Sequence, residues 1–308
     1  MAITITPLTD PDYRAFSRRL AWLAADADGN PVGSAYLRLN SKPSQAHLTE
    51  LELTVHPAER RKGVGSLLLD AATTAAWENE ARIVLADAVA ESPGDHFLAR
   101  HGFTVGLTLV FTRLPLRDTD VPSVAPPTGY ELVAWQGAPP DNLIESFTVT
   151  RAAMNDAPIG DISYGVEAWD VERSRFVAEV VAQRGDRLHT VAAIHQESGD
   201  VVAFTELVVP GDGQADAQHY GTAVRTEHRG HGLARWVKAE QIRQVRADYP
   251  ELRGLLTDMA ESNHAMRAVN DALGYQITHR THRYRLDRPG QPVSEPRPGA
   301  SPWTARAR

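Results

Sequence analysis

The sequence predicts an α/β protein built from two similar domains in tandem, each with one sheet flanked by helices. Two observations lead to this prediction. The chain has 308 residues, a length that favours two domains over one. A glycine-rich stretch also occurs twice, as RRKGVG from Arg60 and as RGHGLA from Arg229, at an offset of 169 residues (229 minus 60). A repeat at a fixed offset indicates two copies of one fold.

Other features of the two copies keep nearly the same offset. Val55 and Val224 each lie five residues before the first arginine of the glycine-rich stretch. Further along, Gly102-Phe103 corresponds to Gly274-Tyr275, at an offset of 172 residues (274 minus 102). Because separate features agree, the second half of the chain is expected to repeat the order of elements in the first half.

The first copy is expected to alternate strands and helices around its glycine-rich turn. Asp28-Gly29-Asn30-Pro31, between two apolar runs, predicts a hairpin. The expected elements are a strand over residues 3–6, a helix over 10–19, hairpin strands over 21–26 and 32–39, a strand over 47–55, a helix over 66–80, a strand over 82–88, a helix over 95–100 and an extended segment over 103–114.

The second copy is expected to follow the same order with a longer helical insertion after its first strand. A turn at Ser198-Gly199-Asp200 separates two apolar strands. The expected elements are a strand over residues 130–134, a largely helical segment over 140–183, strands over 188–195, 201–209 and 219–224, a helix over 233–246, a strand over 255–259, a helix over 264–273 and a closing strand over 275–286.

Proline-rich stretches mark the expected domain boundaries. Residues 115–129 hold four prolines and the tail from Arg288 holds five, and proline removes backbone donors and disfavours regular structure. We therefore expect an N-terminal domain over 1–118, a linker over 119–128, a C-terminal domain over 129–288 and a disordered tail over 289–308.

Composition narrows the function classes. The chain has no cysteine, which excludes disulfides, thiolate metal sites and a cysteine nucleophile. A net charge of −7 does not favour a nucleic-acid groove and would instead attract cationic acceptors such as amines. No signal peptide, membrane-spanning run or paired histidine motif is recognisable, so we expect a cytoplasmic protein without a membrane or metal partner.

The glycine-rich turns predict a site for a diphosphate. Each turn follows a β-rich segment and begins a helix, so free backbone N–H groups point into one concavity, and the helix dipole makes that concavity positive. Glycine lets a phosphate approach the backbone closely, and Arg60 or Arg229 adds a charged contact. Two alternatives are weaker. Structural turns that only cap helices would not explain the repeat, and dinucleotide or Walker A loops need residues that neither turn has.

The two turns resemble the acetyl-CoA signature of the GNAT (N-acetyltransferase) superfamily. The first copy reads LELTVHPAERRKGVGSLLL and the second YGTAVRTEHRGHGLARWV, with Arg225 where proline is usual. The resemblance implies two tandem GNAT-like domains, each with a mostly antiparallel central sheet flanked by helices, and acetyl-CoA as cofactor. The cofactor-binding residues it implies are Val55, Arg60, Arg61, Lys62, Gly63, Val64, Gly65 and Ser66 in the first copy, and Thr222, Val224, Arg229, Gly230, His231, Gly232, Leu233, Ala234, Asn263 and Asn270 in the second.

The same resemblance favours the second copy as the catalytic domain. The family places an asparagine before a helix that ends at Gly-Phe/Tyr, and Asn263 stands there in the second copy, whereas the first copy has Glu91. The second copy also has ample chain between its first two strands for the helices that build an acceptor pocket. The first copy is therefore expected to be degenerate.

Candidates for the catalytic groups follow from the chemistry of acyl transfer to an amine, which needs a base. The resemblance implies Asp258, five residues before Asn263, as the first choice, and Glu206, a carboxylate in an apolar strand, is the second. His219 is the third. The tyrosine that protonates the leaving thiol in many relatives is replaced by Asn270 in the second copy, so Tyr220 and Tyr284 are the substitutes by expected proximity. Each of these groups also has a purely structural interpretation.

The sequence as a whole thus predicts an acetyl-CoA-dependent N-acetyltransferase that acts on a primary amine of a small molecule, such as an aminoglycoside-like, antibiotic or peptide-like metabolite. Direct transfer in the C-terminal domain is expected, in a monomer or homodimer. Two alternatives stay open: acetylation of a protein lysine or N-terminus, and a non-catalytic acyl-CoA sensor or scaffold.

Overall fold

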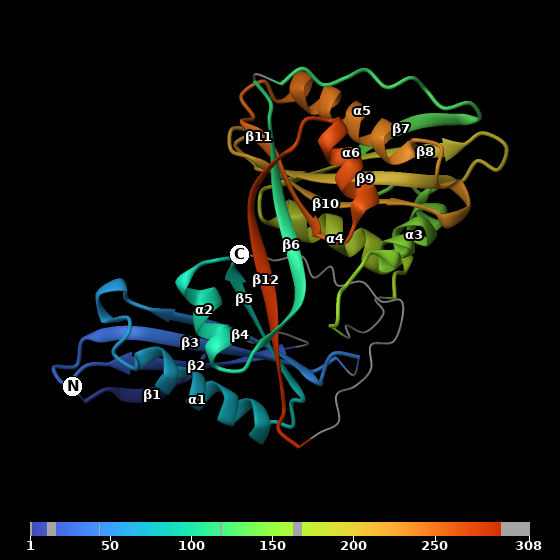
Figure 1. The fold of residues 1–308 in the computed structure, drawn as a ribbon. Helices are drawn as coiled ribbons and strands as arrows, with labels where there is room; N and C mark the ends of the chain where they lie inside the picture. Colours follow the sequence, from blue (N-terminus) through green and yellow to red (C-terminus); the bar gives the residue numbers. More distant parts are fainter. Residues whose placement is uncertain (1, 11–16, 43, 118, 163–167, 291–308) are drawn as a thin grey trace. The chain divides into compact units, whose positions relative to one another are not determined.

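A computed structural model describes residues 2–10, 17–42, 44–117, 119–162 and 168–290 (Figure 1). The chain divides into two compact units. Among the described residues, unit 1 contains the chain up to Thr108, residues 160–162 and the segment from Arg280. Unit 2 contains residues 109–159 and 168–279. Neither unit is one continuous stretch of sequence.

Unit 1 is a sheet covered on one face by two helices. Its strands run in the order β1-β2-β3-β4-β5-β12, with β4 and β5 parallel and the other neighbours antiparallel. Its elements are β1 (Thr4–Leu8), β2 (Ser17–Ala25), β3 (Pro31–Asn40), β4 (Leu48–Val55), η1 (Pro57–Glu59), α1 (Val64–Glu78), β5 (Ile83–Val89) and α2 (Pro93–Arg100), together with parts of β6 (Thr104–Pro115) and β12 (Gln276–Asp287).

The predicted hairpin of unit 1 is present, but the predicted helix over 10–19 is wrong at its end. Residues Ser17–Arg19 belong to β2 and pair with Arg38–Asn40, so the ladder with β3 outweighs the weak local preference for a helix. Residues 11–16 lie outside the described residues. In the turn, the carboxylate of Asp26 accepts hydrogen bonds from the backbone N–H groups of Asp28 and Asn30, each at 2.9 Å.

Unit 2 is a sheet with helices on both faces. Its strands run in the order β6-β11-β10-β9-β8-β7, with β10 and β11 parallel and the other neighbours antiparallel. Its own elements are β7 (Tyr130–Gln136), α3 (Ile144–Ala152), η2 (Ala153–Asp156), α4 (Val171–Gln183), β8 (Arg187–His195), β9 (Val201–Val209), β10 (Ala217–Val224), η3 (Thr226–His228), α5 (Leu233–Asp248), β11 (Gly254–Ala260) and α6 (His264–Ala272).

The last strand of each sequence copy ends in the sheet of the other copy. In β6, residues Leu109–Pro115 pair with β11 of unit 2. In β12, residues Thr281–Asp287 pair with β5 of unit 1. The compact units therefore differ from the segments 1–118 and 129–288, because each sheet needs an antiparallel strand beside β5 or β11 and the two closing strands are equally suited to that position.

The proline-rich segment after β6 packs against unit 2. Val121 and Val124 are partly buried against its core. The guanidinium of Arg246, on α5, donates hydrogen bonds to the backbone carbonyls of Leu116 and Thr119. These contacts attach the start of the expected linker to the sheet that β6 completes.

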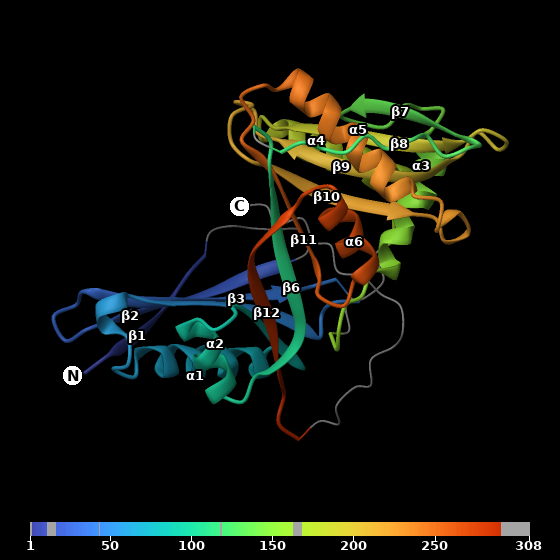
Figure 2. The ribbon, with the colours of Figure 1, turned by 45° about the horizontal axis from the view of Figure 1, so that its top comes forward.

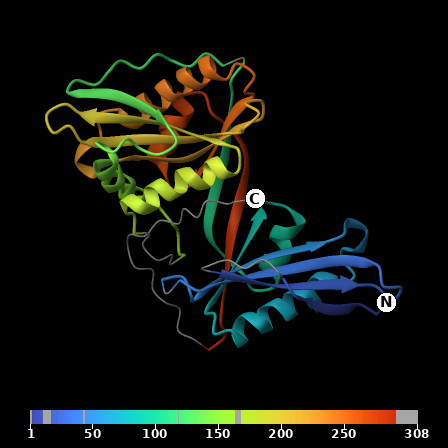
Figure 3. The ribbon, with the colours of Figure 1, turned by 180° about the vertical axis from the view of Figure 1, so that it is seen from behind.

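The two faces of the unit 2 sheet carry different helices. In Figure 1, α5 and α6 lie over one face, and in Figure 3, seen from behind, α3 and α4 lie over the other. Side chains alternate between the faces along each strand. Ala203 and Val224 therefore pack with Trp236 of α5, whereas Phe204 and Ala223 pack with Phe147 of α3. The two faces are referred to below as the α5 face and the α3 face.

Candidate active site

The two glycine-rich turns have the same backbone conformation. In unit 1, the second and fourth residues have left-handed φ angles, +65° at Arg61 and +87° at Gly63. In unit 2, the corresponding angles are +84° at Gly230 and +77° at Gly232. A β-carbon on Gly63, Gly230 or Gly232 would meet no described atom within 4 Å. Each turn therefore opens onto unfilled space beside the first turn of its helix.

The first turns of α1 and α5 keep their backbone donors for another partner. Gly63 and Gly232 are the N-cap residues, and within the described part of the chain no side chain caps either helix. Uncapped N–H groups at a helix start, next to glycines in left-handed conformation, form an anion-binding concavity. The geometry thus fits a diphosphate in both units.

The first arginine of each turn is anchored in the same way. The Nε–H of Arg60 donates to the carbonyl oxygen of Val55 at 3.1 Å, and that of Arg229 donates to Val224 at 3.2 Å. Among the described residues a carboxylate then engages the guanidinium in unit 2 only, where Asp156 lies 2.6 Å from Nη2 of Arg229. The charge of the unit 2 turn is therefore partly neutralised.

A wedge opens between the two parallel strands ahead of each turn. In unit 2, β10 and β11 pair only at Ala217↔Leu255 and Gln218↔Leu256, and they then diverge (Figure 2). In unit 1, β4 and β5 pair only from Leu48↔Ile83 to Leu51↔Ala86. Beyond these pairs the facing strand edges have unpaired backbone groups. An extended amide-containing chain could pair with these edges as an additional strand does.

A bulge lies where the unit 2 wedge begins. The register of β10 against β9 shifts between His219 and Gly221, so Tyr220 is the extra residue. Bulges re-aim side chains and backbone groups and are common beside active sites. Beyond the bulge, Gly221 pairs with Glu206 of β9. A β-carbon on Gly221 would lie only 2.6 Å from the sulfur of Met154, which is closer than real side chains approach.

The α5 face carries the residues predicted to bind the cofactor, together with a buried polar network. The hydroxyls of Thr222 and Thr205 lie 2.9 Å apart. Nε2 of His219 lies 2.7 Å from the hydroxyl of Tyr275. Burial and the charge of Lys238 hold the pKa of His219 well below its usual range, so this imidazole is neutral at physiological pH. Its low pKa makes it a weak base.

The buried side chain of Asn270 indicates whether the wedge of unit 2 suits a donor molecule. Its side chain is fully buried, its amide nitrogen contacts only the sulfur of Met259 at 3.7 Å, and its oxygen Oδ1 has no hydrogen-bond partner among the described residues. A buried unsatisfied carbonyl is costly. An N–H donor from a bound amide chain would satisfy it, so Asn270 fits the predicted role. Asn263 instead caps α6, since its Oδ1 accepts from Met266 N–H at 3.1 Å.

The α3 face carries the three carboxylate and tyrosine candidates. Glu206 belongs to it through its ion pair with Arg151 of α3, and Tyr220 packs with Val181 of α4. Asp258 shares the face by alternation from Leu255, which is in the core under α5. The structure thus places the two carboxylate candidates and Tyr220 on one face of the wedge strands, and the predicted cofactor residues, together with His219, on the other.

Glu206 is the most unusual of these groups. Its side chain is 1% exposed and its Oε1 lies 2.8 Å from Nη1 of Arg151, while Oε2 has no partner among the described residues. Burial raises the pKa of the Glu206 carboxyl, and Arg151 opposes that shift. Arg151 also lies over the ring of Trp169, 4.0 Å from its centroid. A buried carboxylate with one open oxygen beside a strand bulge can accept a proton.

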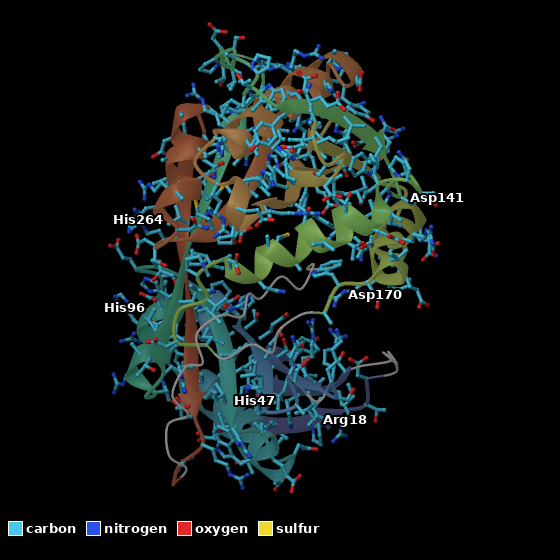
Figure 4. The ribbon with its side chains drawn as sticks, turned by 90° about the vertical axis from the view of Figure 1, so that its right-hand side faces the viewer. Arg18, His47, His96, Asp141, Asp170 and His264 are labelled. Atoms are coloured by element: carbon cyan, nitrogen blue, oxygen red, sulfur yellow. The ribbon has the colours of Figure 1, made fainter. Side chains whose placement is uncertain are left out.

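The helices that hold this face are fixed by polar contacts at their ends. Asp170, labelled in Figure 4, caps α4 by accepting from the backbone N–H of Arg173 at 2.7 Å. Asp141, labelled in the same figure, pairs with Arg175 of α4 at 2.8 Å. Thr148 of α3 and Ser174 of α4 share a buried hydrogen bond of 3.0 Å. These contacts hold the two helices together over Glu206.

The prediction of Tyr284 as a substitute acid for the second copy is wrong. Tyr284 belongs to unit 1, where its hydroxyl donates to Asp95 at 2.7 Å. His282 contacts the same oxygen at 2.8 Å. Burial opposes ionisation of Asp95, but the hydrogen bonds from Tyr284 and His282 outweigh it and hold the pKa of Asp95 below its ordinary value. The exchange of closing strands moved this tyrosine into the other sheet.

Three groups of the unit 2 site were missed by the sequence analysis: Arg151, Lys238 and Tyr275. The burial of Lys238 could have been predicted from the sequence. This residue lies four residues after Ala234 and four before the buried Ile242, so the helical period already places it on the buried stripe of α5. No sequence feature identified Arg151 as the partner of Glu206.

Within the described residues, no helix is both long and apolar enough to cross a membrane. No group of three or more histidine, aspartate or glutamate side chains there is placed to hold a metal ion.

Comparison with known proteins agrees with this geometry. Residues 4–103 match the acetyltransferase (GNAT) family. A tandem GNAT protein from the clavulanic acid biosynthesis pathway superposes with a TM-score of 0.70, at 25% identity over 91% of this chain and 86% of that one. Residues 4–103 belong to the GNAT family, and the chain as a whole has the fold of a tandem GNAT protein. By this membership it is an acyltransferase, and the family generally uses acetyl-CoA and acts on small-molecule or peptide substrates.

Two further structures share the GNAT fold of the chain. A GCN5-related N-acetyltransferase from Sphaerobacter thermophilus has a TM-score of 0.65 at 19% identity, over 88% of this chain and 82% of that one. One from Kribbella flavida has a TM-score of 0.54 at 17% identity, over 84% and 88% of the two chains. The prediction of a mixed α/β fold with mostly antiparallel sheets is confirmed. The family match itself lies in the first GNAT copy, the one expected to be degenerate.

Proposed function

We propose that this tandem GNAT protein is an acetyl-CoA-dependent N-acetyltransferase that acts on a primary amine of a small molecule, by direct transfer in unit 2. One observation carries the proposal. The β10–β11 wedge has uncapped backbone donors and an orphaned amide oxygen on its α5 face, and buried carboxylate chemistry on its α3 face. A donor and an acceptor can therefore approach the same bulge from opposite sides.

The residues of the α5 face would hold the donor. Backbone N–H groups of Gly230 to Ala234 and the side chain of Arg229 would bind its diphosphate. The free edge of β10 at Thr222 and Val224, with Asn270 opposite, would bind its amide arm. When bound, acetyl-CoA supplies the thioester that is cleaved. The corresponding residues of unit 1, from Val55 to Ser66, would bind a second donor molecule in the same way.

The α3 face would supply the base. An amine must be neutral to attack, and a carboxylate of raised pKa is a suitable proton acceptor near neutral pH. Glu206 is buried beside the bulge with an open oxygen, whereas Asp258 is half-exposed. The structure therefore favours Glu206 over Asp258, the reverse of the preference from sequence. Tyr220, at the bulge itself, would line the acceptor side.

Two observations favour a small acceptor: the burial of the α3 face and the similarity to one solved structure. Glu206 is 1% exposed and pairs with Arg151 of α3, which is the burial expected of an enclosed site and not of an open groove for a protein segment. The tandem GNAT protein that superposes with a TM-score of 0.70 comes from the clavulanic acid biosynthesis pathway. Acetylation of a protein lysine or N-terminus would need an open groove, and a sensor would bind the donor without turnover.

Replacing Gly232 with aspartate is expected to abolish cofactor binding to unit 2. The left-handed φ of +77° strains any residue with a β-carbon, and the carboxylate would repel a diphosphate. We expect acetyl transfer to fall at least about a hundredfold, corresponding to roughly 3 kcal/mol. Thiol release with acetyl-CoA and an amine panel measures it, and Gly63→Asp is the matched variant in unit 1. Wild-type turnover by the Gly232→Asp chain would place the reaction elsewhere.

Replacing Glu206 with glutamine is expected to lower kcat at least about a hundredfold if this carboxylate is the base. The change also leaves Arg151 buried without its counter-charge, which costs about 3–5 kcal/mol. A double variant, Glu206→Gln with Arg151→Met, removes both charges and should recover most of that stability but none of the activity. A stable double variant with wild-type kcat would exclude Glu206 and direct attention to Asp258→Asn.

A further inference from the structure

Three histidines and a tyrosine surround the glycine-rich turn of unit 2. The hydroxyl of Tyr130 lies 3.0 Å from Nδ1 of His228. The ring centroids of His195 and His228 are 5.0 Å apart, and that of His231 lies 5.9 Å from Tyr130. These residues come from the start of β7, the end of β8, the short helix η3 and the turn itself. In unit 1 the positions that correspond to His228 and His231 are Glu59 and Lys62.

Each of these imidazoles has its Nδ1 engaged and its Nε2 left for another partner. Nδ1 of His231 donates to the backbone carbonyls of His228 and Arg229, at 3.2 and 3.1 Å. Nδ1 of His195 lies 3.2 Å from the hydroxyl of Ser198. Across the described part of the chain, no side chain or backbone group bonds to Nε2 of any of the three.

The fixed charges of the unit 2 turn do not favour an anion. Between Thr226 and Gly232 the sequence has one arginine and one glutamate, and Arg229 is already paired with Asp156. Arg225, just before this segment, lies 3.5 Å from Asp200. By contrast, the segment Pro57–Gly63 of unit 1 has three cationic residues against one glutamate. Unit 2 therefore offers less fixed side-chain charge than unit 1 to a nucleotide with several phosphates.

The histidines can supply that charge only by taking up a proton. Burial first, and then the neighbouring charge of His195, lower the pKa of His228. Glu227 raises it, and Arg225 and His231 lower it further. His228 is therefore neutral in the free protein near pH 7. An anion beside it would favour the charged form, so binding and proton uptake are thermodynamically linked.

We propose that His195, His228 and His231 form a phosphate subsite beside the turn, which takes the phosphomonoester of the nucleotide donor and gains a proton when it is filled. This inference rests on the proposed function, because it assigns the additional phosphate of coenzyme A to that subsite. The diphosphate is held by the main chain, and the monoester is held by the histidines through their Nε2 atoms. Tyr130 positions His228 through its hydrogen bond.

The test measures coenzyme A binding by calorimetry in the full-length Gly63→Asp chain, so that only unit 2 contributes. We expect the affinity to fall about a hundredfold between pH 6 and pH 8, as for about one linked proton over two pH units. Two buffers of different ionisation enthalpy should report uptake of about one proton at pH 7. The variant His228→Gln keeps a hydrogen-bonding partner for Tyr130 but cannot be protonated, so it should lose most of this pH dependence.

Dephospho-coenzyme A identifies which phosphate is involved. It lacks the monoester and should bind with little pH dependence to the same Gly63→Asp chain. Equal pH dependence of the two ligands would overturn the assignment to the monoester. Tight binding of coenzyme A that is the same at pH 6 and pH 8, without proton uptake, would overturn the subsite and leave the proposed function standing. No binding at any pH would instead overturn the proposed function of unit 2.

Discussion

A chain that ends at Tyr275 is expected to lose the folded state of unit 1, although every missing residue comes from the other end of the sequence. The deletion removes β12, whose residues Thr281–Asp287 form the ladder with Ile83–Val89. It also removes Tyr284, which is buried in the core of unit 1, and Arg283, whose guanidinium binds both carboxylate oxygens of Asp87 at 2.7 and 2.8 Å.

The expected loss is as large as the stability of a typical domain. Asp95 is 8% exposed and would lose its hydrogen bonds from Tyr284 and His282. Unsatisfied buried groups cost about 1–3 kcal/mol each and an uncovered core costs more, against a total of about 5–15 kcal/mol for a domain. We expect hydrogen-exchange protection in β4 and β5 to disappear.

A chain that ends at Gly290 is the matched control, because it keeps the whole of β12. Exchange in β4 and β5 of that chain should equal that of the full-length protein. Protection of these strands in the chain that ends at Tyr275 would show that β12 contributes little to unit 1. Urea unfolding followed by intrinsic fluorescence gives a second measurement of the same loss.

The exchange of β6 and β12 between the two sheets could not be predicted from the sequence. The glycine-rich repeat and the apolar periods predicted nearly every strand and helix, since these signals are local. The segments 103–114 and 275–286 were correctly expected to be extended. Both follow a Gly-aromatic pair and both have a similar alternating pattern, so nothing local distinguishes their partners. The choice between two equivalent sheets is made by tertiary packing.

Some features of the candidate site could likewise be predicted from the sequence and others could not. The conformation of the turns at Gly63 and Gly232 follows from residue types that the sequence displays. That a carboxylate at Glu206 needs a partner also followed from its apolar strand, but its partner Arg151 is 55 positions away in a helix with no distinguishing pattern. The preference for Asp258 over Glu206 came from resemblance alone, and burial reverses it.

Replacing Lys238 with methionine is expected to stabilise unit 2, the opposite of most changes in a core. Lys238 is 1% exposed, and its ammonium lies 4.8 Å from the ring centroid of Tyr275. Burial lowers the pKa of Lys238 from 10.5 to about 7. The charged form is therefore disfavoured in the folded state, and methionine fills a similar volume without that cost.

The pH dependence of the stability difference between the wild type and the Lys238→Met variant tests whether the buried charge is its cause. Because the folded pKa lies below the unfolded one, the unfolded chain binds more protons between about pH 7 and pH 10.5, so the wild type gains stability as the pH rises through this range. The full penalty applies below pH 7. We expect the methionine variant to be more stable by about 2–4 kcal/mol at pH 6, and this advantage to be about 2 kcal/mol smaller at pH 9.

Urea unfolding at the two pH values measures this difference. Arg243→Met, on the exposed side of the same helix, is the control, since its guanidinium stays charged throughout the range. A Lys238→Met chain that is less stable than the wild type by the same amount at both pH values would show that the cation–π contact with Tyr275 outweighs desolvation. A stable variant with reduced acetyl transfer would mean that the ammonium is retained for function at a cost in stability.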